Sequence, residues 1–179
     1  MQSRGWRIDT ARRWATSRDT FADTERDSRN KKMASTKVQL GVEDWVRQEW
    51  LPREFGQRFR RERLKLTPGG VFDSDAVSED DKIVASISTS AASTATGKYA
   101  VGKMNKMRSD MLFLLMVAAC DRRLIVLTDE TMFQQLQKEK SAGRVPTSIE
   151  FKHAKIPAEL ERRLIASQEV ASREVSPER

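Results

Sequence analysis

The sequence has little that could form a disulfide, a zinc site or a membrane span. It contains one cysteine, Cys120, and one histidine, His153, in 179 residues. One cysteine excludes an intrachain disulfide, and this pair supplies too few ligands for a structural zinc ion. The longest apolar run, from Met111 to Cys120, is about half the length of a membrane-spanning helix. We therefore expect a cytoplasmic protein that contacts no membrane.

Nucleotide-binding motifs are missing as well. The sequence contains no G-x-G-x-x-G, so a dinucleotide-binding fold lacks its fingerprint. The pair Gly97-Lys98 is similar to the end of a P-loop, but Ala92 stands at the first glycine position and Tyr99 follows the lysine. A Walker-type nucleotide site is therefore excluded.

Positive charge, in contrast, is abundant. The formal net charge is +7 and the isoelectric point is near 9.8. Residues 1–32 carry nine Lys or Arg and five Asp or Glu, so the remaining chain is only mildly basic. The total charge makes nucleic acid, DNA or RNA, a candidate partner, and the mildly basic body weakens that signal. A homodimer is one assembly open to such a protein.

The composition changes at Met33. Residues 1–32 lack a hydrophobic period and are expected to be a disordered leader, or a segment upstream of a true start at Met33. We expect a single α/β domain over residues 33–170 and a flexible C-terminal tail over 171–179.

Hydrophobic periodicity predicts the order of elements. Val38, Val42, Trp45, Val46 and Trp50 recur at helical spacing and predict a first helix that ends near Pro52. Strands are expected over 58–66, 71–77, 82–90, 123–128 and 149–156, and further helices over 99–119, 130–140 and from 157 onward. The last two turns of the 99–119 helix are apolar on every side, which predicts burial all round. This order indicates an α/β fold around one mixed sheet.

Asp73 and Asp75 are the most informative polar pair. Side chains two apart in a strand point to one face, so these carboxylates are expected to converge and could bind a hard divalent cation. The alternative is a pair of solvated residues on an edge strand.

The element order and the segment from Gly69 to Asp75 resemble the restriction-endonuclease-like, or PD-(D/E)XK, nuclease superfamily. The resemblance covers most of residues 37–165 and implies a three-layer core in which helices flank a central mixed sheet. It also implies that Asp73 or Asp75 is the hairpin aspartate that binds Mg²⁺ or Mn²⁺, with Glu43 as an additional ligand. We expect the ion to be held by Asp73 and Asp75 together. A Glu near a helix start also favours the helix dipole, which explains Glu43 without a metal.

The sequence departs from this family at the (D/E)-X-K motif. By the resemblance, Ser86, Ile87 and Ser88 occupy the motif positions, so the second acid and the lysine are both absent. Some family members move the lysine to the following helix, and the replacements here would be Lys98, Lys103 or Lys106. The alternative is that these lysines form a solvated helix face.

A dense basic segment precedes the candidate site. Candidate phosphate contacts are Arg58, Arg60, Arg61, Arg63, Lys65 and, on the later helix, Arg108. Alternation would instead place several of these residues on an ordinary exposed strand face.

Two functions remain open from the sequence. The first is a Mg²⁺-dependent endonuclease that hydrolyses phosphodiesters with an incomplete motif. The second is a catalytically inactive relative that binds nucleic acid or a protein through the same scaffold.

Overall fold

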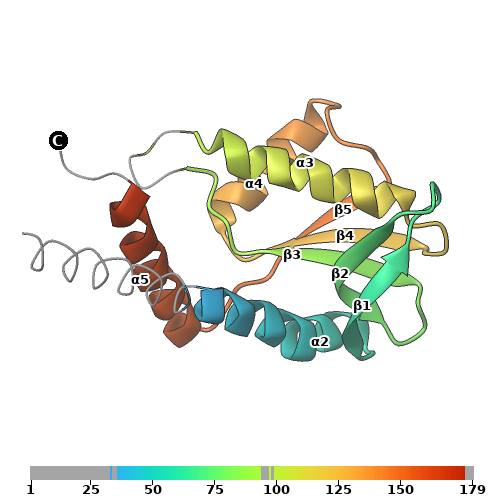
Figure 1. Cartoon of the computed structure of the whole chain (residues 1–179), viewed down its shortest axis with the longest axis horizontal. Helices are drawn as coiled ribbons and strands as arrows, with labels where there is room; N and C mark the ends of the chain where they lie inside the picture. The colour runs from blue at the N-terminus through green and yellow to red at the C-terminus, as the bar shows by residue number, and fades with distance from the viewer. Residues whose placement is uncertain (1–32, 34–35, 94–96, 98, 176–179) are drawn as a thin grey trace, which may run out of the picture.

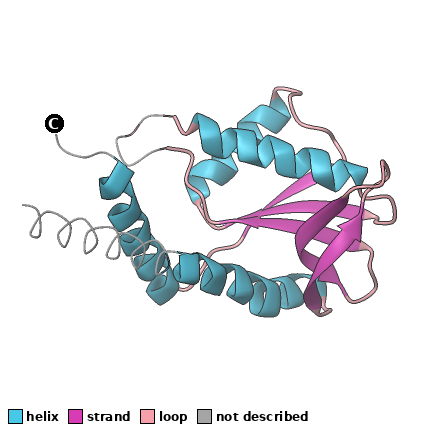
Figure 2. Ribbon diagram, in the orientation of Figure 1, coloured by secondary structure: helices cyan, strands magenta, loops and turns pink. Residues whose placement is uncertain are grey.

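The computed structural model describes residues 33, 36–93, 97 and 99–175. These residues form one five-stranded sheet with helices on both of its faces (Figures 1 and 2). The predicted α/β class, with a central mixed sheet flanked by helices, is therefore confirmed. The predicted leader, residues 1–32, lies outside the described residues.

The strands lie in chain order across the sheet. They are β1 (Phe59–Lys65), β2 (Val71–Ser78), β3 (Ile83–Ser88), β4 (Arg122–Leu127) and β5 (Ile149–His153). The first three are antiparallel neighbours, whereas β3, β4 and β5 run parallel. Parallel strands are covered on both faces, which explains the continuous apolar run Leu124–Leu127.

One face of the sheet is covered by the first helical segment. Residues 36–45 are helical and continue through η1 (Val46–Trp50) into α2 (Leu51–Phe55). Gly56 ends α2 in the left-handed conformation, with φ of 69°. Val46 and Leu51 are fully buried in the cluster that includes Ala85 and Leu124 of the sheet.

The opposite face is covered by α3 (Val101–Met116) and α4 (Glu130–Ser141). Buried side chains from both helices form a cluster with the sheet: Met104, Met107, Met111, Leu114, Met132 and Leu136. The prediction that the end of α3 is buried all round is wrong. Leu112, Phe113 and Leu115 are exposed, because only one side of the helix meets the sheet.

The last helix, α5 (Ala158–Val175), lies beside the first helical segment (Figure 1). Val42 packs there against Ile156 and Leu164. The helix runs past residue 170, so residues 171–175 of the expected tail are helical, and residues 176–179 lie outside the described residues. Within the described residues, no helix has the length and apolar character needed to cross a membrane.

Candidate functional site

The site is built where β2 and β3 diverge. The ladder between these strands pairs Ala76 with Ala85 and Val77 with Val84. Beyond it, two side chains of β2 take over the bonding: Ser74 Oγ donates to the Ala85 carbonyl at 3.1 Å, and Asp75 Oδ2 accepts from the Ile87 amide at 2.9 Å. Side chains thus separate the two strands and open the sheet at Asp75.

A β-bulge aims the Asp75 side chain into this opening. The register of β1 with β2 passes from Arg60 opposite Val77 to Glu62 opposite Ser74, so Arg61 alone faces both Asp75 and Ala76. The extra residue in β2 interrupts the ladder and turns the strand locally. Asp75 is only 19% exposed as a result of this placement between the layers.

Helix α3 contributes a second carboxylate from the other side of the opening. Asp110 is buried, and its Oδ2 lies 2.7 Å from Lys106 Nζ and 3.2 Å from Ser86 Oγ. Ser86 Oγ also lies 3.4 Å from Asp75 Oδ2. A hydroxyl has one proton to donate, so Ser86 can satisfy only one of the two carboxylates at a time.

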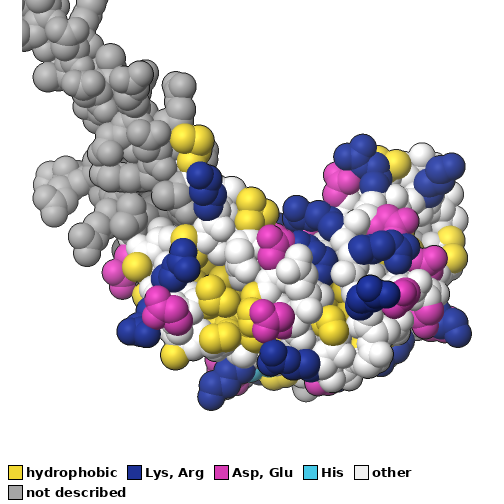
Figure 3. Space-filling view, turned by 90° about the horizontal axis from the view of Figure 1, so that it is seen from below, with side chains coloured by type: hydrophobic (Ala, Val, Ile, Leu, Met, Phe, Trp, Pro, Cys, Tyr) yellow, Lys and Arg dark blue, Asp and Glu magenta, His cyan; other side chains and the backbone are white. Residues whose placement is uncertain are grey.

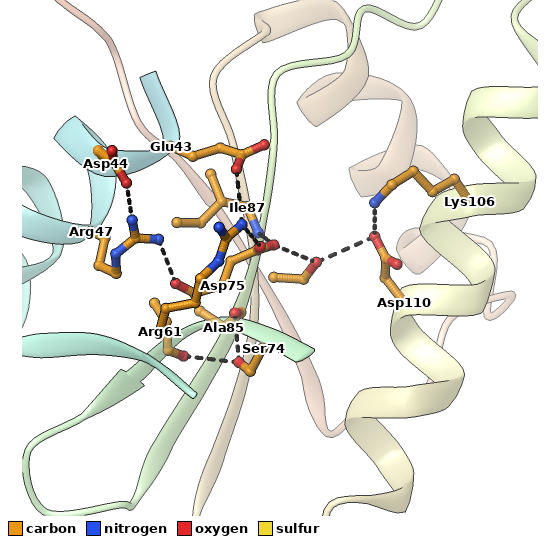
Figure 4. A network of polar contacts seen from close by, with 12 residues as sticks. Glu43, Asp44, Arg47, Arg61, Ser74, Asp75, Ala85, Ile87, Lys106 and Asp110 are labelled. Atoms are coloured by element: carbon orange, nitrogen blue, oxygen red, sulfur yellow. Dashed lines mark hydrogen bonds and ion pairs between the residues drawn. The ribbon is translucent and has the colours of Figure 1, made fainter. Parts of the chain in front are cut away.

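The first helical segment contributes a third carboxylate and a buried arginine (Figure 4). Glu43 Oε2 lies 3.5 Å from Arg61 Nη2, which also lies 3.4 Å from Asp75 Oδ1. Arg47 donates to the main-chain carbonyl of Asp75 at 2.8 Å and forms an ion pair with Asp44. The site therefore brings together side chains from the first helical segment, the sheet and α3.

The electrostatic field at Glu43 reflects this crowding of carboxylates. Burial raises the pKa of Glu43, and the negative charge of Asp75 raises the pKa further. The positive charges of Arg61, Arg47 and Lys106 act in the opposite direction. The net effect is a raised pKa, because the positive neighbours do not fully offset burial and the charge of Asp75.

The two aspartates singled out by their spacing have different surroundings. Asp73 is 68% exposed and forms an ion pair with Arg63 at 2.7 Å, and this hydrogen bond lowers the pKa of Asp73. Asp73 and Asp75 each face an arginine of β1, and these arginines are two residues apart. The carboxylates thus lie on one face, but only Asp75 contacts Ser86 and Ile87.

The replacement lysines are also separated. Lys106 lies at the site through its bond to Asp110, whereas Lys103 is half-buried on the first turn of α3 with no ion pair among the described residues. Lys98 lies outside the described residues. Of the two degenerate motif positions, Ser86 lies at the site, and Ser88 is buried and accepts a bond from the Ser90 amide.

Most of the predicted phosphate-contacting cations already have acidic neighbours. Arg58 pairs with Glu79, Arg60 with Glu62 and Asp81, Arg63 with Asp73, and Arg108 with Glu139. Lys65 is exposed and has no ion pair among the described residues. Charges of both signs are interspersed over the face in Figure 3. Nucleic-acid binding by these residues stays a prediction, and it would require exchange of internal ion pairs for phosphate contacts.

Sequence reasoning missed Asp110 and Arg47. Asp110 is the only acidic residue of α3, and it lies four residues after Lys106, a spacing that places the two side chains on one helix face. The sequence does carry a signal for Asp110: it is a single carboxylate within the apolar stripe of Met107, Met111 and Leu114. Arg47 follows the buried Val46 and lies one turn after Glu43, so it too borders a core stripe.

The donor set suits a hard divalent cation. As the side chains stand, no three His, Cys, Asp or Glu residues within the described ranges are grouped closely enough to hold a metal ion. Glu43 and Asp75 nevertheless converge on one positive group, the Arg61 guanidinium, and Asp110 approaches from across Ser86. These are carboxylate oxygens, the ligands that Mg²⁺ and Mn²⁺ prefer, so the chemistry of the donors suits such an ion, and metal binding here stays a prediction.

Comparisons of this chain with protein-family models, with curated proteins and with solved structures find no match.

Proposed function

We propose that this protein is a metal-dependent nuclease that hydrolyses phosphodiesters of nucleic acid on a restriction-endonuclease-like scaffold. The observation that carries the proposal is the convergence of Glu43, Asp75, Asp110 and Lys106 where β2 and β3 separate. Support also comes from the element order: a helix, three antiparallel strands, a helix and a parallel strand. This is the order that the sequence resemblance implies.

Each residue has a role consistent with its position. Asp75 and Glu43 would hold the ion, and Asp110 would supply the acidic group absent at Ser86. Mg²⁺ or Mn²⁺ supplies a Lewis acid that polarises the phosphate and lowers the pKa of a bound water. Lys106 would supply the positive charge absent at Ser88, where developing negative charge on the phosphate needs stabilisation.

A second candidate function is favoured by the ion pairs themselves. Arg61 neutralises Glu43 and Asp75, and Lys106 neutralises Asp110. Internal cations would make a metal ion unnecessary for stability. The alternative is therefore a catalytically inactive relative that binds nucleic acid or a protein partner.

Cleavage assays with matched aspartate variants test the proposal. The full chain is incubated with single-stranded and duplex DNA and RNA in Mg²⁺, in Mn²⁺ or in EDTA. Asp75→Asn and Asp110→Asn should each reduce metal-dependent cleavage by about 100-fold or more, because each removes a charged group at the reacting centre. Asp73→Asn makes the same chemical change two residues along the strand and should keep full activity.

Two outcomes would contradict the nuclease proposal. A loss of activity in Asp73→Asn as large as that in Asp75→Asn would place the chemistry on the exposed strand face. Absence of cleavage of all four substrates, together with metal-independent binding of nucleic acid, would instead favour the inactive relative.

A further inference from the structure

The Arg61 guanidinium lies between two carboxylates that come from different elements of the fold. A single nitrogen, Nη2, lies 3.5 Å from Glu43 Oε2 on the first helical segment and 3.4 Å from Asp75 Oδ1 on β2 (Figure 4). Both carboxylates are largely buried. Without a cation between them, their like charges would repel each other in surroundings that screen charge poorly.

The two arginines at the site differ in their freedom to move. The Arg47 side chain is only 9% exposed and is bonded to the Asp75 main-chain carbonyl. The Arg61 side chain is 52% exposed, and it contacts the site only through long ion pairs at the tip of its guanidinium. Arg61 can therefore leave for solvent by side-chain rotation, whereas the departure of Arg47 would disrupt the bulge.

We propose that Arg61 and a divalent cation are alternative occupants of the position between Glu43 and Asp75. In the metal-free protein the guanidinium supplies the positive charge that holds the helix against the bulge. When Mg²⁺ or Mn²⁺ binds, Arg61 is displaced into solvent. This inference rests on the proposed metal site and assigns Arg61 as the residue that sets its affinity.

Metal affinity in a matched pair of arginine variants tests this exchange. Mn²⁺ binding is measured by calorimetry for the wild-type chain, Arg61→Gln and Arg63→Gln. Arg61→Gln should bind Mn²⁺ about threefold to tenfold more tightly, because the ion no longer competes with two ion pairs. Arg63→Gln makes the same change two residues along β1, where Arg63 forms an exposed ion pair with Asp73. This variant should bind Mn²⁺ with the affinity of the wild type.

A second measurement uses the unaltered chain. Mass spectrometry follows the modification of arginines by phenylglyoxal with and without Mg²⁺. Mg²⁺ should increase the modification rate of Arg61 and leave that of Arg63 unchanged. This result is independent of whether Arg61→Gln folds normally.

The outcomes separate this inference from the proposed function. Mn²⁺ binding to the wild type with no gain in Arg61→Gln, or with unchanged Arg61 reactivity, overturns the exchange and leaves the metal site standing. Binding to Arg61→Gln alone supports the exchange. Absence of binding by every protein, together with absence of cleavage, overturns the metal site and the exchange with it.

Discussion

At the scale of single residues, Asp75 bonds to β3 through its side chain, as Ser74 does, but as an acceptor and not as a donor. Its side chain, not its backbone, accepts the Ile87 amide, and its own carbonyl accepts from Arg47. Both bonds involve a side chain, so neither belongs to a regular β-ladder. The residue at the centre of the proposed chemistry is thus also the residue that fixes the opening of the sheet.

Arg122 and Glu150 provide a residue-scale prediction about pH. Arg122 donates two hydrogen bonds to Glu150, at 2.8 and 2.7 Å, and these bonds lower the pKa of Glu150 from its ordinary value of 4.5. A carboxyl with a lowered folded-state pKa stabilises the protein above the unfolded pKa, and this stabilisation is lost as pH falls through the folded value. Arg122→Gln should therefore lower the free energy of unfolding by about 0.5–1 kcal/mol at pH 7, because the pair is partly exposed.

Urea unfolding at neutral and acidic pH checks this expectation. The difference between Arg122→Gln and the wild type should shrink at pH values below the folded pKa of Glu150. Glu150→Gln should show the same pH-dependent loss. A cost of Arg122→Gln that is equal at both pH values would assign it instead to the contact of Arg122 with the Phe55 ring, at 4.8 Å.

The predictability of the site also varies residue by residue. The strand alternation places Asp73 and Asp75 on one face, but it cannot show that Asp75, and not Asp73, lies in a bulge. A bulge depends on the contacts of both neighbouring strands, including Arg47 from a distant helix. Asp110 was missed because pattern analysis weighed the cations of α3 and not the single carboxylate among its apolar residues.

At the scale of secondary-structure elements, Arg47 connects the first helical segment to β2. It is the buried side-chain donor to the Asp75 carbonyl, so its removal takes a charged donor away from that acceptor. Arg47→Met should lower the free energy of unfolding by about 2 kcal/mol, as expected for loss of a hydrogen bond from a charged donor. Thermal and urea unfolding measure this effect.

Arg53→Met is the matched control for Arg47→Met. Arg53 is exposed on the same helical segment, and Glu49 is its one ion-pair partner among the described residues. Its replacement should therefore change the free energy of unfolding by less than about 0.5 kcal/mol. Equal losses in the two variants would show that Arg47 does not fix the bulge.

The elements themselves were largely predictable, because their signals are local. The 3.6-residue period of Val38, Val42 and Val46 and the apolar run Leu124–Leu127 are visible in the sequence alone. The exposure of Leu112 and Phe113 on α3 was not predictable in this way. A helix that is apolar all round looks the same in sequence whether a second layer covers it or not.

At the scale of the whole molecule, the first and last described helices hold each other in place. Val42 packs against Leu164, and Glu43 is the next residue on the same helical turn. Leu164→Ala should lower the free energy of unfolding by about 2–4 kcal/mol by removing buried apolar contacts. It should also weaken Mn²⁺ binding, because the turn that carries Glu43 loses its support.

Ile165→Ala controls for effects on α5 itself. Ile165 neighbours Leu164 but is exposed, so its replacement should have little effect on stability or on Mn²⁺ affinity. Chemical unfolding and calorimetry measure both quantities. Unchanged Mn²⁺ affinity in Leu164→Ala, despite lower stability, would show that α5 does not support the site.

The packing of Val42 against Ile156 and Leu164 also sets an order of events during synthesis. A ribosome releases the segment that carries Glu43 before the sheet, yet these two hydrophobic partners emerge after every strand. Asp75, Asp110 and Lys106 can therefore assemble on the nascent chain before Glu43 is fixed beside them. A chain that stops short of α5 would lack the contact of Leu164 with the helical turn that carries Glu43, so this support for the site forms only after the last strand and α5 have been synthesised.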